Sequence, residues 1–300
     1  MLESIPNVSE GRRPEVIDRL ARAVNRPGVW LLDRTSDPDH HRSVFTLAGE
    51  PEPLIDALFA LYERALQEVD LRRPRGVHPR LGAVDVVPFV PLASRPMADA
   101  VAAAEVLGRR VAERFGLPVL LYEQAARRPE RQRLPKVRRG GFERLAERLA
   151  VPGGEPDFGP RRPHPSAGAT VIGARDFLIA FNFVLSREDL ALARGIAAEI
   201  REAAGGLAGV RALGLALESR RRAQVSVNLV DTRATTLREL FDAVQSRARK
   251  AGAEVDESEL IGLLPAHAVE GDLADLARDL RLPRLERHQV VEWALEDAGA

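Results

Sequence analysis

The sequence of 300 residues lacks cysteine entirely, and Lys136 and Lys250 are its two lysines. Without cysteine, the chain can form no disulfide bond, offers no thiolate nucleophile and cannot ligate zinc through sulfur. Because almost every positive charge is therefore an arginine, one interpretation is that guanidinium groups bind carboxylates. The other interpretation is that the arginine content reflects the base composition of the genome.

The chain also lacks a net charge, long apolar runs and many aromatic residues. Its 44 lysine and arginine residues balance 44 aspartate and glutamate residues, and aromatic residues make up 5%. A general nucleic-acid surface is not indicated, since RNA binding needs basic groups interleaved with aromatic side chains for base stacking. No stretch approaches the roughly 18 apolar residues of a membrane span, and the first residues lack the apolar core of a secretory signal. We expect a cytoplasmic protein that binds neither nucleic acid nor a membrane.

The first half of the chain has the hydrophobic periodicity of alternating strands and helices. The order is β-α-β-β-α-β, which is the order of a ferredoxin-like unit, and a helix over 97–115 and a strand over 118–123 follow it. The six elements of the unit are expected as strands over 2–8, 29–35, 43–49 and 83–90 and helices over 14–24 and 53–69.

The second half repeats this order after a boundary near Asp176. Ser186 with Asp189 is expected to begin one helix, and Thr236 with Glu239 has the spacing of a capping box at the start of another. We predict an α+β protein of two ferredoxin-like subdomains, residues 1–176 and 177–300, with helices packed on mixed or antiparallel sheets. The elements of the second half are expected as strands over 177–185, 210–217, 223–231 and 258–265 and helices over 187–200 and 236–252, with two short helices after them.

Two stretches between these elements lack a regular pattern. Residues 127–139 hold six arginines and one lysine against one glutamate, which indicates either a solvated surface or attraction of an anionic ligand. Residues 151–170 are rich in proline and glycine, which is typical of a linker or a binding loop.

Histidines are the candidate acid–base residues of this chain. His267 and His288 lie near predicted helices and are interpreted as structural. A metal site is not indicated, because two adjacent histidines in an extended segment point to opposite sides. The other four histidines lie in turns or loops beside strands, where functional groups are commonly displayed. They are the adjacent pair His40 and His41, together with His78 and His164.

The stretch GVHPRLGAVDVVPFVP, residues 76–91, meets every fixed position of the pattern G-x-H-P-R-x-G-A-x-D-V-x-P-F-x-P. With this stretch the chain resembles the formiminotransferase family. Residues 6–11 resemble the family's P-N-x-S-E-G opening, and residues 156–160 resemble the start of its central folate segment. FLIAFN, AQVSVNL and LIGLLP resemble its second-half strands, so the resemblance extends over nearly the whole chain.

The resemblance implies a homodimer that transfers the formimino group from N-formimino-L-glutamate to tetrahydrofolate, its co-substrate, in histidine degradation. It implies that His78 is the catalytic histidine, and an imidazole with an ordinary pKa of about 6.5 suits proton transfer near neutral pH. No metal is required. Arg80, Arg42 and His41 are candidates for binding the substrates, whose carboxylates suit arginine forks. The folate-contacting loop corresponds to residues 159–168, with the candidates Gly159, Pro160, Arg161, Arg162, His164, Ser166 and Gly168.

Some positions depart from the family's pattern, and some alternatives stay open. Ala167 stands where the vertebrate fusion enzymes carry an aromatic residue, and those enzymes lack the doubled arginine at 161–162. Arg80 has the alternative of a structural ion pair with Asp85 or Asp33. The transferred group has the alternative of being formyl, as in a glutamate formyltransferase or a 5-formyltetrahydrofolate cyclo-ligase-like enzyme, and a non-catalytic folate-binding or RNA-binding protein is a further alternative. We expect the deamination that fusion enzymes add to belong to another protein.

Overall fold

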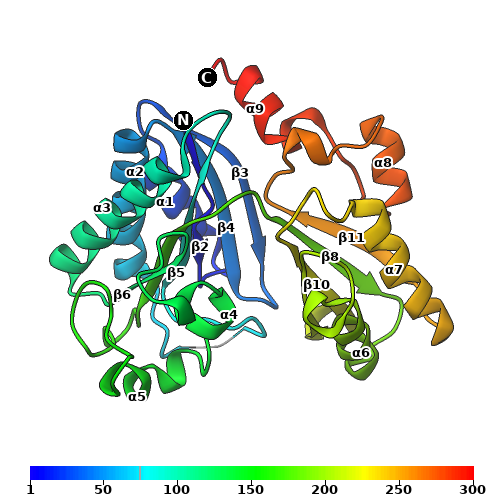
Figure 1. Cartoon of the computed structure of the whole chain (residues 1–300), viewed down its shortest axis with the longest axis horizontal. Coiled ribbons are helices and arrows are strands. Elements are labelled where there is room, and N and C mark those ends of the chain that lie inside the picture. Colours follow the sequence, from blue (N-terminus) through cyan, green and yellow to red (C-terminus); the bar gives the residue numbers. More distant parts are fainter. Residues whose placement is uncertain (74–75) are drawn as a thin grey trace. The chain divides into compact units, whose positions relative to one another are not determined.

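The computed structural model describes residues 1–73 and 76–300, which form two compact units, Met1–Asp176 and Phe177–Ala300 (Figure 1). Each unit combines helices with one sheet, which is mixed in the first unit and antiparallel in the second. Each unit also has its own buried apolar core. The predicted α+β class is therefore confirmed.

A seven-stranded sheet forms the centre of the first unit. Its strands are β1 (Leu2–Ser4), β2 (Asn7–Val8), β3 (Val29–Asp37), β4 (Arg42–Gly49), β5 (Val84–Pro91), β6 (Val119–Glu123) and β7 (Thr170–Ala174). β1 and β2 lie between β4 and β5 and pair antiparallel with both, while β3 pairs with β4. β7 and β6 extend the sheet beyond β5 in the parallel direction.

Two differences from the sequence-based expectation lie within this sheet. The strand expected over 2–8 is two strands, because Pro6 has no N–H for a ladder; its carbonyl accepts from the N–H of Phe45 at 3.1 Å instead. β7 was not predicted, since this short apolar run directly follows the proline- and glycine-rich stretch. Gly173 in β7 lies so close to β6 that an added Cβ would come within 2.3 Å of the Tyr122 carbonyl oxygen. The parallel pairing of β7 with β6 therefore needs a glycine there.

Three long helices cover one face of this sheet (Figure 1). They are α1 (Pro14–Val24), α2 (Pro51–Glu68) and α3 (Met97–Phe115). The predicted apolar stripe of α1, which includes Val16 and Leu20, is buried against the sheet. In the part of the chain that the structure describes, none of the helices combines the length and apolar character that crossing a bilayer requires.

The opposite face of β5, β6 and β7 is covered by the arginine-rich segment and the residues after it. This region forms two short helices, α4 (Leu134–Val137) and α5 (Leu145–Ala150). Alternate residues of a strand point to opposite faces, and Leu121 of β6 belongs to the main core while Tyr122 packs in a second apolar cluster with Val137 and Leu145. The arginine-rich segment is therefore anchored on the sheet.

The second unit is an antiparallel sheet with the strand order β11-β8-β10-β9. Its elements are β8 (Ile179–Leu185), α6 (Leu190–Ile200), β9 (Val210–Leu217), β10 (Arg222–Leu229), α7 (Leu237–Lys250) and β11 (Val255–Ile261), followed by α8 (Leu273–Asp279) and α9 (Val291–Asp297). The equivalent strands of the first unit have the same order, with β5 beside β1 and β2, then β4, then β3. Both units thus contain a ferredoxin-like core. Short 3-10 turns lie at 129–131, 142–144, 202–204, 218–220, 266–268 and 287–289.

Of the two helix starts that the sequence indicates in this unit, one is confirmed and one is wrong. Thr236 caps α7, because its hydroxyl accepts from the N–H of Glu239 at 3.2 Å while the Glu239 carboxylate accepts from the N–H of Thr236 at 2.8 Å. α6 begins at Leu190 rather than 187, and Asp189 alone is its cap. Ser186 directly follows β8, and its hydroxyl accepts from the N–H of Glu254 at 3.0 Å.

Thr236→Ala is expected to lower the free energy of unfolding of the second unit by about 1 kcal/mol, because the N–H of Glu239 loses its acceptor. Thr236→Ser keeps a hydroxyl at this position and is the matched control. Urea titration followed by circular dichroism measures both variants. An alanine variant as stable as the serine variant would contradict the capping role.

Candidate active site

Three segments of the first unit meet at one end of its sheet. Val8 in β2 pairs with Ser43 at the start of β4 and with Val84 at the start of β5. Because β2 runs antiparallel to both neighbours, the residues that follow β2 lie beside the residues that precede β4 and β5. The sheet therefore gathers residues 9–13, 39–42 and 76–83 in one place.

His78 lies in the segment before β5 and is half-buried. Its Nδ1 lies 3.0 Å from the carbonyl oxygen of Pro79. Because a carbonyl oxygen can only accept, this contact places a hydrogen on Nδ1 and leaves Nε2 of the neutral ring as the proton acceptor. The local backbone thus orients the imidazole and selects its tautomer.

The 39–42 segment supports the histidine loop from the side. The N–H of Val77 donates to the carbonyl of Asp39 at 3.0 Å. Gly76 approaches this segment so closely that an added Cβ would lie 2.1 Å from the His40 carbonyl oxygen. The rings of His40 and His78 lie close together, with 5.7 Å between their centroids and an angle of 44° between their planes.

A buried ionic cluster lies beside His78. Asp85 Oδ2 accepts from Nη2 of Arg42 at 2.7 Å and from Nη2 of Arg138 at 2.5 Å. The same Nη2 of Arg42 donates to the Pro79 carbonyl at 2.9 Å, and its Nη1 donates to the side-chain oxygen of Asn7 at 2.8 Å. The Pro79 carbonyl is thus shared between Arg42 and the imidazole of His78.

The electrostatics of this cluster favour a neutral His78. Burial by itself would raise the pKa of Asp85, but Arg138 and Arg42 hold it below its ordinary value. Burial lowers the pKa of Arg42 to about 10, which still leaves it charged at neutral pH. Burial, reinforced by these two arginines, holds the pKa of His78 well below its ordinary value. Two cations and one anion leave the cluster with one excess positive charge.

Residues 9–11 close the site from the side of β2. The hydroxyl of Ser9 donates to the Gly82 carbonyl at 2.7 Å. The Glu10 carboxylate accepts from the N–H of Arg12 and from the N–H and guanidinium of Arg13. These contacts tie the opening motif of the chain to the loop that carries the histidine.

His41 is held by this same segment. Its Nδ1 accepts from the N–H of Gly11 at 3.1 Å and lies 3.7 Å from Glu10 Oε1. Burial lowers the pKa of His41, and its backbone has a φ of 50°. His41 therefore fastens the two segments together with a neutral ring, and its role toward substrate stays a prediction.

Arg80 and Arg42 have different interaction partners. Its guanidinium donates to the Leu71 carbonyl at 2.9 Å and to Glu143 Oε1 at 3.0 Å, and it lies over the Phe142 ring. The expected alternative pairing of Arg80 with Asp85 is wrong, since Arg42 and Arg138 hold that carboxylate. Arg80 instead connects the histidine loop to a neighbouring pocket.

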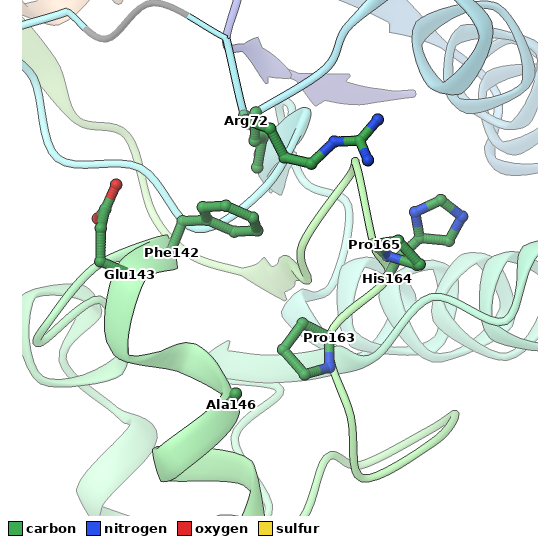
Figure 2. Close-up of a pocket in the computed structure, with 8 residues that line it drawn as sticks. Arg72, Phe142, Glu143, Ala146, Pro163, His164 and Pro165 are labelled. Atoms are coloured by element: carbon green, nitrogen blue, oxygen red, sulfur yellow. The ribbon is translucent and has the colours of Figure 1, made fainter.

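That pocket has a volume of about 290 Å³. Figure 2 shows the Phe142 ring extending toward the loop that carries Pro163, while the His164 ring lies on the far side of that loop. His164 Nδ1 accepts from the N–H groups of Ser166 and Ala167 at 3.4 and 3.1 Å, and burial lowers the pKa of His164. The lining residues are Leu71, Arg72, Phe142, Glu143, Ala146, Pro163, His164 and Pro165.

The glycines of the 159–168 loop hold it tightly against the sheet. Gly159 has a φ of +87°, and an added Cβ would lie 2.6 Å from the Leu117 carbonyl oxygen. Gly168 has a φ of +70°, and an added Cβ would lie 2.1 Å from the Leu81 carbonyl oxygen. Gly168 also exchanges two backbone hydrogen bonds with His164. The loop that borders the pocket is therefore fixed at both ends.

The other candidates in this loop have different surroundings. Arg161 is directed toward the end of α5, where it donates to the Ala150 carbonyl and pairs with Glu155 at 3.2 Å. Arg162 is exposed and Pro160 is partly buried. The carbonyl of Ser166 accepts from the N–H of Leu71 at 2.8 Å. Arg161 and Ser166 are therefore held by other parts of the first unit.

The arginine-rich segment contributes one residue to the ionic cluster, which is Arg138. Three of its other arginines form ion pairs elsewhere: Arg127 with Glu105, Arg128 with Glu155 and Arg131 with Asp157. The site residues that sequence reasoning missed are Asn7, Asp85 and Arg138. Asp85 did carry a signal, because a carboxylate inside the apolar run of a buried strand needs a charged partner.

Comparisons with known proteins extend over both units. The family model of the formiminotransferase domain, N-terminal subdomain, matches residues 1–175, and the model of the formiminotransferase domain matches residues 180–299. A glutamate formimidoyltransferase of Streptococcus pyogenes serotype M1 is 43% identical over 270 residues, 90% of each chain. A glutamate formimidoyltransferase of Thermoplasma acidophilum is 38% identical over 303 residues, 100% of this chain and 98% of that one. The formimidoyltransferase-cyclodeaminase of Rattus norvegicus is 40% identical over 90% of this chain, which spans about half (51%) of that relative's length.

Asp85→Asn is expected to lower the free energy of unfolding by about 3–5 kcal/mol, because it leaves two buried guanidinium groups without their counter-charge. Asp18→Asn is the matched control, since Asp18 forms an exposed ion pair with Arg34 and its loss costs at most about 1 kcal/mol. Guanidinium chloride titration measures both. Equal stability of the two variants would show that the buried cluster is not a structural anchor.

Proposed function

The chain belongs to the formiminotransferase family, and we infer that it transfers the formimino group from N-formimino-L-glutamate to tetrahydrofolate, giving 5-formiminotetrahydrofolate and L-glutamate. The observation that carries this conclusion is the match of both formiminotransferase domain models, which together span nearly the whole chain. Tetrahydrofolate is a co-substrate in this reaction, and the product belongs to one-carbon metabolism. The reaction is a step of histidine degradation.

The chemistry exchanges one amine for another at an amidine carbon. The ring nitrogen N5 of tetrahydrofolate forms a bond to the formimino carbon, which becomes tetrahedral. N5 then loses a proton, the bond between that carbon and the glutamate nitrogen breaks, and the departing nitrogen gains a proton. One acid–base group can carry both proton transfers in sequence.

His78 is the group that we propose for both transfers. Its low pKa keeps the imidazole neutral at pH 7, so it can accept a proton from N5. The hydrogen bond from Nδ1 to the Pro79 carbonyl leaves Nε2 as the atom that receives the proton and then delivers it. After acceptance, the imidazolium beside two arginines is a stronger acid than an ordinary imidazolium, which favours release of the proton to the glutamate nitrogen.

The proposed folate-contacting residues lie on the 159–168 loop and at the pocket that it borders. A volume of about 290 Å³ is near the lower end of the range for small-ligand pockets. The tightly held glycines of the loop and the neutral ring of His164 support this assignment. The residues proposed are Gly159, Pro160, Arg161, Arg162, His164, Ser166 and Gly168.

The substrate carboxylates are proposed to be recognised by Arg80, Arg42 and His41. Arg80 links the histidine loop to the pocket, which supports a role toward a ligand that extends between them. Arg42 and His41 are engaged with protein groups, so we propose that they act mainly by shaping the site around His78. We also propose that the enzyme works as a cytoplasmic homodimer.

His78→Ala is expected to lower kcat/KM by about 10²–10⁴-fold, because the variant loses its positioned acid–base group, while tetrahydrofolate binding stays close to that of the wild type. His288→Ala is the matched control, since His288 is an exposed residue that pairs with Glu286. Formation of 5-formiminotetrahydrofolate and calorimetric titration with tetrahydrofolate provide the two measurements. A wild-type rate in the His78 variant would exclude the proposed mechanism.

A comparison of donors tests the identity of the transferred group. With tetrahydrofolate present, N-formimino-L-glutamate is expected to support turnover far better than N-formyl-L-glutamate. The reason is that the amidine group can be protonated on nitrogen at neutral pH, which activates its carbon toward attack by N5. The carbonyl carbon of an amide is less reactive toward the same attack. Mass spectrometry of the folate product distinguishes the two groups. A preference for the formyl donor, or tight folate binding without any transfer, would overturn the formimino assignment.

A further inference from the structure

We propose that Arg138 is a positioning residue for the transfer reaction, because it shares the buried Asp85 carboxylate with Arg42 and so leaves one uncompensated positive charge beside the His78 ring. This inference rests on the proposed function, in which His78 carries the proton. Arg138 comes from the arginine-rich segment, whose other ion pairs lie elsewhere. It acts through His78 rather than by touching substrate.

The geometry divides a single carboxylate between two cations. Both guanidinium groups donate to Oδ2 of Asp85, while Oδ1 accepts from the N–H groups of Leu81 and Gly82 at 2.7 and 3.3 Å. The side chains of Arg42, Asp85 and Arg138 are 7%, 0% and 13% exposed. Water therefore screens the excess charge poorly, and it acts strongly on neighbouring groups.

Unpartnered nitrogen atoms support the same conclusion. Nε of Arg42 and Nε of Arg138 are buried, and neither has a hydrogen-bond partner among residues 1–73 and 76–300. Buried donors usually find acceptors, so the cluster holds more donor capacity than the described protein groups satisfy. Its positive charge is thus not offset by further acceptors at these two guanidinium nitrogens.

Several charged or titratable groups face His78. They are His40 from the 39–42 segment, Arg42 from the start of β4 and Arg138 from the end of α4, while Asp85 of β5 binds both arginines. His41 is engaged with the segment after β2, where its Nδ1 accepts from the N–H of Gly11 and lies 3.7 Å from Glu10 Oε1. Arg138 is the best group to vary, since Arg42 also holds Asn7 and the Pro79 carbonyl that orients the imidazole.

The sign of the effect follows from the charges. With Arg138 present, a proton on His78 would lie beside a cluster that is already positive, so the ring stays neutral down to a lower pH. Replacing Arg138 with a neutral residue leaves Arg42 and Asp85 as a balanced pair, and the pKa of His78 should rise toward its ordinary value. The acid side of the kcat/KM profile, which reports this pKa in the free enzyme, should then move to higher pH.

The test compares Arg138→Gln with Arg138→Lys, which keeps the charge, and with Arg144→Gln, which removes an exposed arginine paired with Glu147. Titration of isotope-labelled histidine by NMR measures the pKa of His78 directly, with the signal assigned from His78→Gln. We expect the glutamine variant at 138 to raise this pKa and to lose kcat/KM several-fold more below pH about 6 than at pH about 8. The lysine variant and Arg144→Gln should keep the wild-type profile.

The outcomes separate this inference from the proposed function. A His78 titration that is the same in wild type and Arg138→Gln would overturn the role of Arg138, whatever the activity of His78→Ala. If Arg138→Gln does not fold, the titration of His78 in the wild-type protein remains a test. A His78 pKa at or above the ordinary value of about 6.5 would also overturn the role of Arg138. A wild-type rate for His78→Ala would overturn the proposed role of His78, and folate binding without any transfer by the wild type would overturn the proposed function, while the titration would still report on Arg138 in both cases.

Discussion

The buried carboxylate of Asp85 is the group on which the rest of the site depends. It lies inside an apolar strand and is fully buried, so it requires donors, and four of them converge on it: two backbone N–H groups and the side chains of Arg42 and Arg138. The pairing draws the start of β4 and the end of α4 to the start of β5. Arg42, once held there, fixes the Pro79 carbonyl, and that carbonyl orients the imidazole of His78.

The sheet makes this convergence possible. Because β2 is antiparallel to both β4 and β5, one end of the sheet collects the residues after β2 and the residues before its two neighbours. Gly76 and Gly82 then let the backbone segments approach within distances that no side chain would allow. Short contacts among three segments that are far apart in the sequence thus hold the histidine in place. Proton transfer between two nitrogens requires such a fixed geometry.

Much of the fold was predictable because it follows from local periodicity. The helices α1, α2 and α3 begin near the expected residues, and the capping box of Thr236 and Glu239 is present. The errors occurred where tertiary contacts compete with local pattern. Pro6 divides a strand whose two halves both find partners, β7 completes a sheet after a loop-like composition, and Ser186 binds the N–H of Glu254 instead of beginning α6.

By itself, the sequence determined the α+β class, the repeated element order, the absence of thiol chemistry and the motif around His78, because all of these depend on composition or on residues close together in the chain. Only the tertiary structure decided which arginine meets which carboxylate. Arg80 and Arg138 lie five residues before and 53 residues after Asp85, yet the distant arginine is the one that binds it, while Arg80 turns to Glu143. Charge pairing acts through space, and which partners come within a few ångströms is set by packing on the sheet rather than by their separation along the chain.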